Sequence, residues 1–205
     1  MKTVVMFPRW IGRRRSEGPA IGPYQDERVV VRAPEFDDFR QWRELRAASR
    51  RFLTPWEPSW PSDDLTRSAF AARIRRHERE RIERTGFAYF LFERGSEQLL
   101  GGVNLSHVRM GSARSAMLGY WMGESHAGKG LMKRGLQLLL PAAFGEIGLM
   151  RLEAVCLPEN TRSLGLLEKL GFKREGIVRE YLEINGQRRD HVLLSMIARE
   201  APGNG

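Results

Sequence analysis

A strand, a glycine-containing loop and a helix follow one another between residues 116 and 144, and this succession most restricts the possible fold. The run AMLGYWM is typical of a buried strand, and residues 131–144 carry apolar side chains at helical spacing. Between them lies GESHAGKG, residues 123–130, which contains three glycines. A strand that passes through a short loop into a helix indicates a chain that mixes both kinds of element in one layered domain.

The loop has the spacing of a nucleotide-binding P-loop but lacks one of its functional groups. Gly123, Gly128 and Lys129 fit G-x-x-x-x-G-K, yet Gly130 follows where a P-loop has the Ser or Thr that holds Mg²⁺. No predicted strand ends in a suitable magnesium-binding Asp, so the sequence argues against ATP hydrolysis. The loop still collects backbone N–H groups at a helix N-terminus, which can bind a pyrophosphate without metal. A simple tight turn into a helix is the alternative.

The other predicted elements complete a mixed α/β (α+β) domain, neither doubly wound nor a barrel. Periodicity and turn residues place them, in chain order, as a strand at 28–32, a helix at 37–51, a stiff proline-rich loop at 52–61, a charged helix from Ser62 to residue 84, strands at 87–93 and 99–108, a strand at 152–157, a helix at 160–170 and a hairpin at 176–197. Pro141 should kink or shorten the helix at 131–144.

Composition and the two termini indicate how far the domain extends and where in the cell the protein is expected. We expect residues 1–27 to be a loosely ordered basic tail, 28–198 to form the domain and 199–205 a C-terminal tail. The N-terminus lacks the features of a secretory signal, and no apolar run is long enough to span a bilayer. A single cysteine allows no internal disulfide, which together with these points leads us to expect a cytoplasmic protein.

Charge and histidine spacing bear on partners. The net charge of +9 favours acidic partners or ribonucleoprotein surroundings, although many basic proteins bind no nucleic acid. The helix segment 73–84 is either a solvated face with oppositely charged residues four positions apart, such as Arg76 and Glu80, or a basic surface for RNA or an acidic substrate. The four histidines show no metal-ligand spacing, so we expect no metal.

Several long motifs in one order resemble the GCN5-related N-acetyltransferase (GNAT) family. These are GYWMGESHAGKGLM at 119–132 and PENTRSLGLLEKLGF at 158–172. Together with FLTPWEP at 52–58 and REYLEINGQRRDHVLLS at 179–195, they resemble most closely its RimJ/RimL branch, the ribosomal-protein N-terminal acetyltransferases, and within it the RimJ type. The resemblance covers about residues 28–197. It implies a mixed sheet of six to seven strands, flanked by about four helices and splayed between strands four and five.

The resemblance implies that acetyl-CoA binds at the glycine loop and at the start of the following helix. In the family this loop often begins with Gln or Arg, where this chain has Ser125. The implied cofactor-binding residues are Trp121, Met122, Ser125, His126, Ala127, Gly128, Lys129, Gly130, Leu131, Met132, Asn160 and Ser163. Backbone N–H groups near Trp121 and Met122 would hold the oxyanion of an acyl transfer.

The implied reaction is direct attack of a free α-amine on the thioester. Ser163 in Asn160-x-x-Ser163 is our candidate to protonate the departing thiolate; bonding to its own backbone is the alternative. Glu57 is the leading candidate to hold or deprotonate the acceptor amine, because two prolines and Trp56 would keep its loop rigid, or else it is a solvated loop residue. Glu180 is a weaker candidate.

Aromatic residues complete the predicted acceptor site. Phe52, Trp56 and Glu57 are expected to bind the acceptor, with Trp42 and Trp60 as further possible walls or simple packing residues. Tyr120, opposite to Trp121 on its strand, reads as a core residue more readily than a catalytic one.

The sequence therefore predicts an acetyl-CoA-dependent acetyltransferase acting on the N-terminus of a ribosomal protein, without metal or membrane. Two alternatives stay open. The acceptor could be another amine, such as a small molecule or an amino acid, because acceptor choice depends on the loop 52–61. The chain could also be a ribosome- or RNA-binding assembly factor that uses its basic helix.

Overall fold

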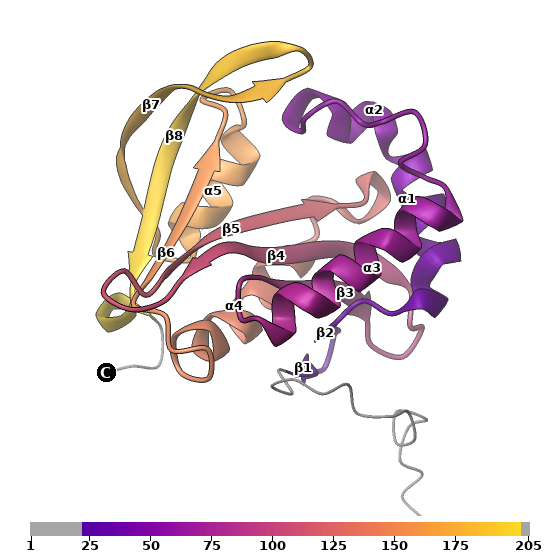
Figure 1. Ribbon diagram of the computed structural model, residues 1–205, viewed down its shortest axis with the longest axis horizontal. Helices are drawn as coiled ribbons and strands as arrows, with labels where there is room; N and C mark the ends of the chain where they lie inside the picture. Colours follow the sequence, from indigo (N-terminus) through magenta and orange to yellow (C-terminus); the bar gives the residue numbers. More distant parts are fainter. Residues whose placement is uncertain (1–21, 202–205) are drawn as a thin grey trace, which may run out of the picture.

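The computed structural model describes residues 22–201, which build one mixed β-sheet covered by helices on both faces (Figure 1). The strands are β1 (Tyr24–Gln25), β2 (Val29–Arg32), β3 (Phe87–Glu93), β4 (Leu99–Arg109), β5 (Ser115–Met122), β6 (Arg151–Cys156), β7 (Lys173–Ile184) and β8 (Gln187–Ile197). The α-helices are α1 (Phe39–Ala48), α2 (Arg50–Leu53), α3 (Arg67–Ile82), α4 (Leu131–Phe144) and α5 (Thr161–Lys169). Short 3-10 turns are η1 (Phe36–Asp38), η2 (Thr54–Trp56), η3 (Glu124–His126) and η4 (Ala198–Glu200).

The strand order is β1-β2-β3-β4-β5-β6-β8-β7, and all neighbours are antiparallel except β5 and β6. The predicted α/β class is confirmed. The described residues contain eight strands where six to seven were expected, because Tyr24 and Gln25 pair with Val31 and Val30. Tyr24 and Gln25, which lie in the segment expected as a tail, therefore form a strand; residues 1–21 lie outside the described range.

Two apolar layers hold the helices to the sheet, and β3 shows how the sequence creates both. Its side chains alternate, so that Tyr89 and Leu91 join the core under α4 and α5, whereas Phe90 and Phe92 join the core under α1 and α3. In the second core the ring centroids of Trp42 of α1 and Phe70 of α3 lie 4.8 Å apart. A strand buried on both faces explains the nearly continuous apolar run FAYFLFE.

The sheet opens between β5 and β6. The two strands pair in parallel over three residue pairs, from Ser115 with Arg151 to Met117 with Glu153, and then separate. Beyond Met117, β5 keeps its antiparallel partner β4 as far as Met122. This is the predicted splay, since β5 and β6 are the fourth and fifth strands once the two-residue β1 is set aside. A cleft results because neither strand edge has a neighbour there.

Several local predictions are confirmed. α5 has Asn160 as its N-cap, with the side-chain oxygen accepting from Ser163 N–H at 3.1 Å, and Gly171 follows the helix at φ +98°. The β7–β8 hairpin turns through Asn185 and Gly186, both with positive φ.

Other local predictions were wrong in detail. The charged helix α3 starts at Arg67, capped by Thr66 instead of Ser62, because residues 62–65 first form hydrogen-bonded turns. The loop at 52–61 contains the end of α2 and the turn η2, which accepts Pro55 in its first turn, where no N–H bond is required. Pro141 does not shorten α4, which runs over 131–144 as drawn from the sequence.

Candidate functional site

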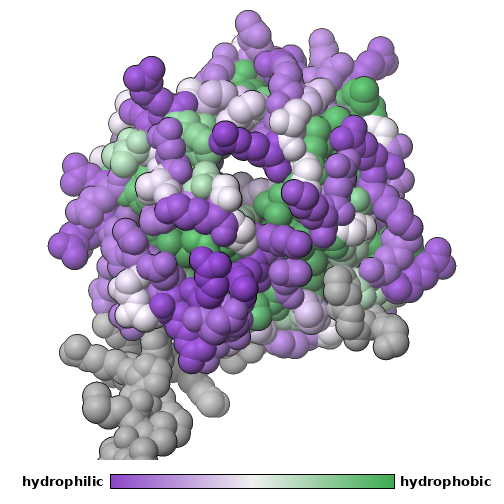
Figure 2. Space-filling view, turned by 180° about the vertical axis from the view of Figure 1, so that it is seen from behind, coloured by the Kyte–Doolittle hydropathy of each residue, from purple (hydrophilic) through white to green (hydrophobic). Residues whose placement is uncertain are grey.

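A cavity of about 1600 Å³ occupies the cleft between β5 and β6. Its walls come from the end of β5, the loop to α4, the start of α5, the α2–η2 segment and the β7–β8 hairpin. Figure 2, which views the molecule from behind Figure 1, shows a hollow near the centre with hydrophilic side chains around it. Segments far apart in the sequence thus share one open space.

The loop to α4 has the geometry of an anion cradle. Gly128 and Gly130 both adopt φ +76°, a left-handed conformation that favours glycine, and Gly130 is the N-cap of α4. A Cβ at either glycine would meet no atom within 4 Å, so the open side of the loop faces free space. The N–H groups at the start of a helix lack intrahelical partners. A pyrophosphate therefore fits here.

Most of the predicted cofactor residues line the cavity. Ser125 and Lys129 do not, although both lie in the loop. The lining residues from the predicted set are Trp121, Met122, His126, Ala127, Gly128, Gly130, Leu131, Met132, Asn160 and Ser163.

The charges around the cavity suit a polyanion. Lys133, Arg162 and Lys169 line it on the side of α4 and α5. Burial, and after it the positive charge of Lys129, lowers the pKa of His126, so this imidazole is uncharged at neutral pH. The donor set, backbone N–H groups with lysine and arginine side chains, fits the phosphates of coenzyme A.

The exposed edge of β5 supplies a main-chain donor. Gly123 N–H bonds to Leu100 O, which places this N–H on the β4 side of the strand. Because N–H groups along a strand alternate between its two edges, Met122 N–H points away from β4 and into the cleft. Trp121 N–H points toward β4. Of the two predicted oxyanion donors, Met122 is therefore the one with a suitable direction.

Ser163 lies at the centre of a small polar cluster on the cavity wall. Its hydroxyl is 2.6 Å from the Tyr120 hydroxyl and accepts from the Cys156 thiol at 3.2 Å. The Tyr120 hydroxyl can also donate to the Ser163 carbonyl oxygen, at 3.3 Å. Burial raises the pKa of the Tyr120 phenol, and the hydrogen bond to Ser163 offsets only part of this rise. Tyr120 thus packs on the core, as expected, but its hydroxyl reaches the cavity.

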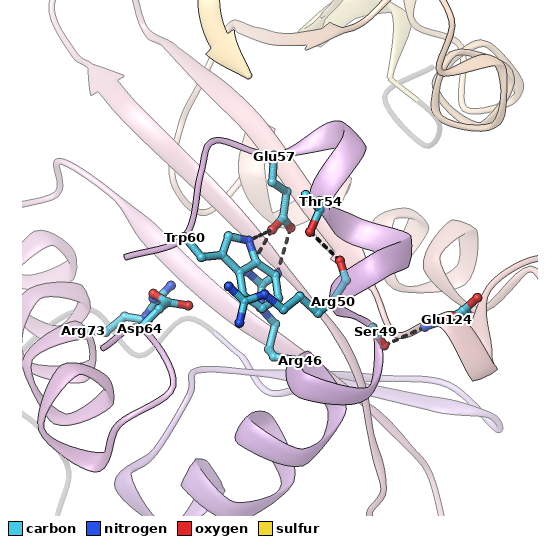
Figure 3. Close-up of polar contacts among 9 residues, drawn as sticks. All are labelled: Arg46, Ser49, Arg50, Thr54, Glu57, Trp60, Asp64, Arg73 and Glu124. Atoms are coloured by element: carbon cyan, nitrogen blue, oxygen red, sulfur yellow. Dashed lines mark hydrogen bonds and ion pairs between the residues drawn. The ribbon is translucent and has the colours of Figure 1, made fainter. Parts of the chain in front are cut away.

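Glu57 is held by two other side chains (Figure 3). Arg46 donates to both carboxylate oxygens at 2.8 Å, and Trp60 Nε1 donates to one of them at 2.8 Å. The guanidinium of Arg46 also stacks on the Trp60 ring, 4.0 Å from its centroid, and is itself buried. Glu57 lines the cavity with Phe52 and Trp56, so the three predicted acceptor residues lie together. The pairing with Arg46 weakens the argument that Glu57 is a base, since its oxygens already accept three bonds.

Three other predicted residues lie elsewhere. Glu180 lies in a bulge of β7 at φ +48°, where its N–H bonds to Asp190, and does not line the main cavity. Trp42 is 1% exposed in the core under α1 and α3. Trp60 serves as partner of Glu57 and Arg46 instead of a cavity wall.

No pattern in the sequence indicated a role at the site for Arg46, Cys156, Tyr181 or His191. The last three line the cavity, and Tyr181 and His191 are in edge contact at 6.0 Å between ring centroids. Arg46 occurs in a helix rich in arginine, where pattern alone cannot mark the single buried one. Arg46 is distinguished only by its contacts with Trp60 and Glu57 in the folded protein.

Two hydrogen bonds join the walls of the site. Glu124 N–H, in the loop to α4, donates to Ser49 Oγ at 2.9 Å (Figure 3). Asn185 Nδ2, at the tip of the β7–β8 hairpin, donates to Thr54 O at 3.2 Å. The α1–α2–η2 segment therefore contacts both the loop that would hold the cofactor and the hairpin on the opposite wall.

Within residues 22–201, no helix is long and apolar enough to cross a membrane, and no three His, Cys, Asp or Glu side chains are grouped to hold a metal ion.

Comparison with known proteins agrees with this geometry. Residues 28–173 match the family model of the acetyltransferase (GNAT) domain. The chain is 34% identical over 170 residues to the ribosomal protein uS5-alanine N-acetyltransferase of Escherichia coli (strain K12), covering 83% of this chain and 88% of that protein.

Solved structures of acetyltransferases are also similar to this chain. RimJ of Mycobacterium smegmatis, in complex with CoA-disulfide, superposes with a TM-score of 0.80 at 30% identity and covers 85% of this chain and 84% of its own. The ribosomal-protein-S5-alanine acetyltransferase of Vibrio fischeri gives a TM-score of 0.81 at 26% identity, with 87% and 97% covered.

Proposed function

Because the chain belongs to the GNAT acetyltransferase family, we propose that it moves the acetyl group of acetyl-CoA to the free α-amine at the N-terminus of a ribosomal protein. The observation that carries this proposal is the cavity between β5 and β6. It is lined by the glycine loop that can bind an anion, by Ser163 and by the segment that contains Glu57. Relatives that acetylate an alanine of ribosomal protein uS5 or S5 support a small first residue in the acceptor.

The cofactor side of the cavity fixes the thioester. The loop N–H groups around Gly128 and Gly130, together with Lys133 and Arg162, hold the phosphates. Met122 N–H donates to the carbonyl oxygen as it gains negative charge. Ser163 donates its hydroxyl proton to the departing sulfur. These roles for the predicted cofactor and catalytic residues are part of the proposal.

The acetyl transfer does not require a strong general base. A neutral α-amine attacks the carbonyl carbon, so that an N–C bond forms and the C–S bond breaks. The nitrogen loses a proton to water, and the sulfur gains one. With an ordinary pKa near 8, an α-amine is partly neutral already at cellular pH. We therefore assign Glu57 to hold the amine through its carboxylate, positioned by Arg46 and Trp60, and assign no base role to Glu180.

We place this reaction in the cytoplasm, where ribosomal proteins are made. Direct contact with the ribosome or with RNA would come from the basic face of α3. In that helix Arg73 pairs with Asp64, and Arg76 pairs with Glu80 at 3.7 Å, so part of its charge is already compensated. Recognition of the N-terminal segment alone is the simpler proposal.

Release of coenzyme A thiol from acetyl-CoA tests the function. The acceptors are short peptides that copy ribosomal-protein N-termini, each with a free or a blocked α-amine, and with the first residue varied. We expect release with the free amine only, and faster release for alanine than for bulky first residues. Equal release with both forms would show that the α-amine is not the acceptor.

Failure with every peptide, although acetyl-CoA binds, would overturn peptide N-terminal acetylation and point to a small-molecule amine or a binding role. RNA binding that weakens steeply with salt, and does so equally without acetyl-CoA, would support the assembly-factor alternative.

A further inference from the structure

Ser163 has more hydrogen-bond partners than its proposed role as proton donor requires. Tyr120 approaches from β5, on the opposite wall of the cleft from α5, and its hydroxyl lies 2.6 Å from Ser163 Oγ. Cys156 approaches from β6 and donates to the same oxygen. The Ser163 backbone N–H is fixed by Asn160. The cluster therefore ties three elements together at the point where the cleft begins to narrow.

A serine hydroxyl has one proton and two acceptor lone pairs. The Cys156 thiol occupies one lone pair. If Ser163 donated to Tyr120, its only proton would be used and none would remain for a ligand. If Tyr120 donates to Oγ, which at 2.6 Å is closer than the Ser163 carbonyl oxygen at 3.3 Å, both lone pairs are occupied and the Ser163 hydroxyl proton has no partner within the cluster. A phenol is a far stronger acid than an alcohol, so the phenol is the better donor of the pair.

We propose that Tyr120 is a positioning residue for the reaction: it donates to Ser163 Oγ and so directs the Ser163 proton toward the departing sulfur. This inference rests on the proposed role of Ser163 in acetyl transfer. Burial keeps the phenol protonated, because it raises the pKa of Tyr120, and Tyr120 therefore remains a donor throughout the physiological range. The pair also crosses the cleft, which holds the start of α5 at a fixed distance from β5.

A double-mutant cycle on the full chain tests the proposal. Tyr120→Phe removes one hydrogen bond and should lower kcat about tenfold with little change in the KM for acetyl-CoA. Ser163→Ala should lower kcat about 100-fold. The double variant should be no slower than Ser163→Ala alone, within about twofold, because Tyr120 acts only through Ser163.

Tyr89→Phe is the matched control. Tyr89 is also a buried tyrosine of the sheet, but its hydroxyl has no hydrogen-bond partner among residues 22–201, so kcat should be unchanged. Multiplied losses in the double variant would overturn the proposal, because Tyr120 would then act independently of Ser163. A normal kcat for Tyr120→Phe would overturn it as well.

A binding measurement separates this inference from the proposed function. Calorimetry at about pH 9, where thiols begin to ionise, compares coenzyme A with desulfo-coenzyme A. Wild type should prefer coenzyme A, and Tyr120→Phe and Ser163→Ala should lose this preference equally. That result would stand even if no amine were acetylated. A preference retained in Tyr120→Phe would overturn the proposal even if acetyl transfer were demonstrated.

Discussion

Single side chains decide what the acceptor wall can do. Arg46 pairs with Glu57 and stacks on Trp60, so the loop that carries Phe52 and Trp56 is fixed by a partly buried ion pair. The two oxygens of Glu57 already accept three hydrogen bonds but still offer a lone pair to an amine. Holding the acceptor amine and deprotonating it are therefore separate tasks at this site.

Substituting Glu57 by Gln tests this distinction. Glu57→Gln keeps the shape but leaves the buried Arg46 without its counter-charge, so we expect a loss of about 1–3 kcal/mol in unfolding free energy. The KM for a peptide acceptor should rise about tenfold, the equivalent of one hydrogen bond. In both proteins kcat/KM should rise with pH up to the α-amine pKa near 8, because only the neutral amine attacks.

Glu44→Gln, on the exposed face of α1, the helix that carries Arg46, is the control. It should change neither the unfolding free energy nor the KM for the peptide. If Glu57 were the general base, its variant would instead lose about 100-fold or more in kcat at an unchanged KM. Steady-state kinetics across pH, with urea unfolding of each variant, would decide between the two roles.

At the scale of elements, the start of α5 connects stability with function. Asn160 caps the helix through Ser163 N–H and also lines the cavity. The cap fixes the first turn, and the first turn carries the Ser163 hydroxyl. Helix formation and placement of the proposed proton donor therefore depend on the same contact.

Comparing two N-cap variants separates these contributions. Asn160→Ala and Thr66→Ala each remove the side-chain acceptor of a helix cap, and each should cost about 1 kcal/mol of unfolding free energy. Thr66 caps α3, away from the cavity, so only Asn160→Ala should weaken acetyl-CoA binding. Thermal unfolding and a Kd for acetyl-CoA measure both. Equal affinity in the two variants would contradict the placement of Asn160 at the cofactor.

Most elements were predictable because their signals are local. The alternation in β3, the asparagine cap of α5 and the turn residues Asn185 and Gly186 all operate within a few residues. The failures involve contacts between distant residues. β1 is strand only because β2 lies beside it, and α3 begins late because residues 62–65 form turns of their own.

In the functional site too, features with local sequence signals were predicted and features that depend on distant contacts were not. The cofactor loop was recognisable because glycine spacing and motif order are written in the sequence. Arg46 and the hydroxyl of Tyr120 were missed, because their roles arise from partners on other elements. Glu180 was placed near the groove from its strand, yet it lies in a bulge and does not line the cavity, whereas its neighbour Tyr181 does.

For the whole molecule, the open seam between β5 and β6 is where we propose that the two substrates meet. Parallel pairing stops after three residue pairs, which frees the edge of β5 and the first turn of α5. The α1–α2–η2 segment and the β7–β8 hairpin then form the other walls and meet through Asn185 and Thr54. One cavity therefore carries the basic residues Lys133, Arg162 and Lys169 on the side of α4 and α5 and the segment that contains Glu57 on another wall.

The affinity of a bisubstrate compound tests this central claim most directly. Coenzyme A is joined through an acetyl linker to the α-amine of a short peptide that begins with alanine, and its Kd is measured by calorimetry. If both substrates meet in the β5–β6 cavity, the conjugate should bind at least about 100-fold more tightly than coenzyme A and compete with both substrates. Binding no tighter than coenzyme A, or competition with acetyl-CoA alone, would contradict the account.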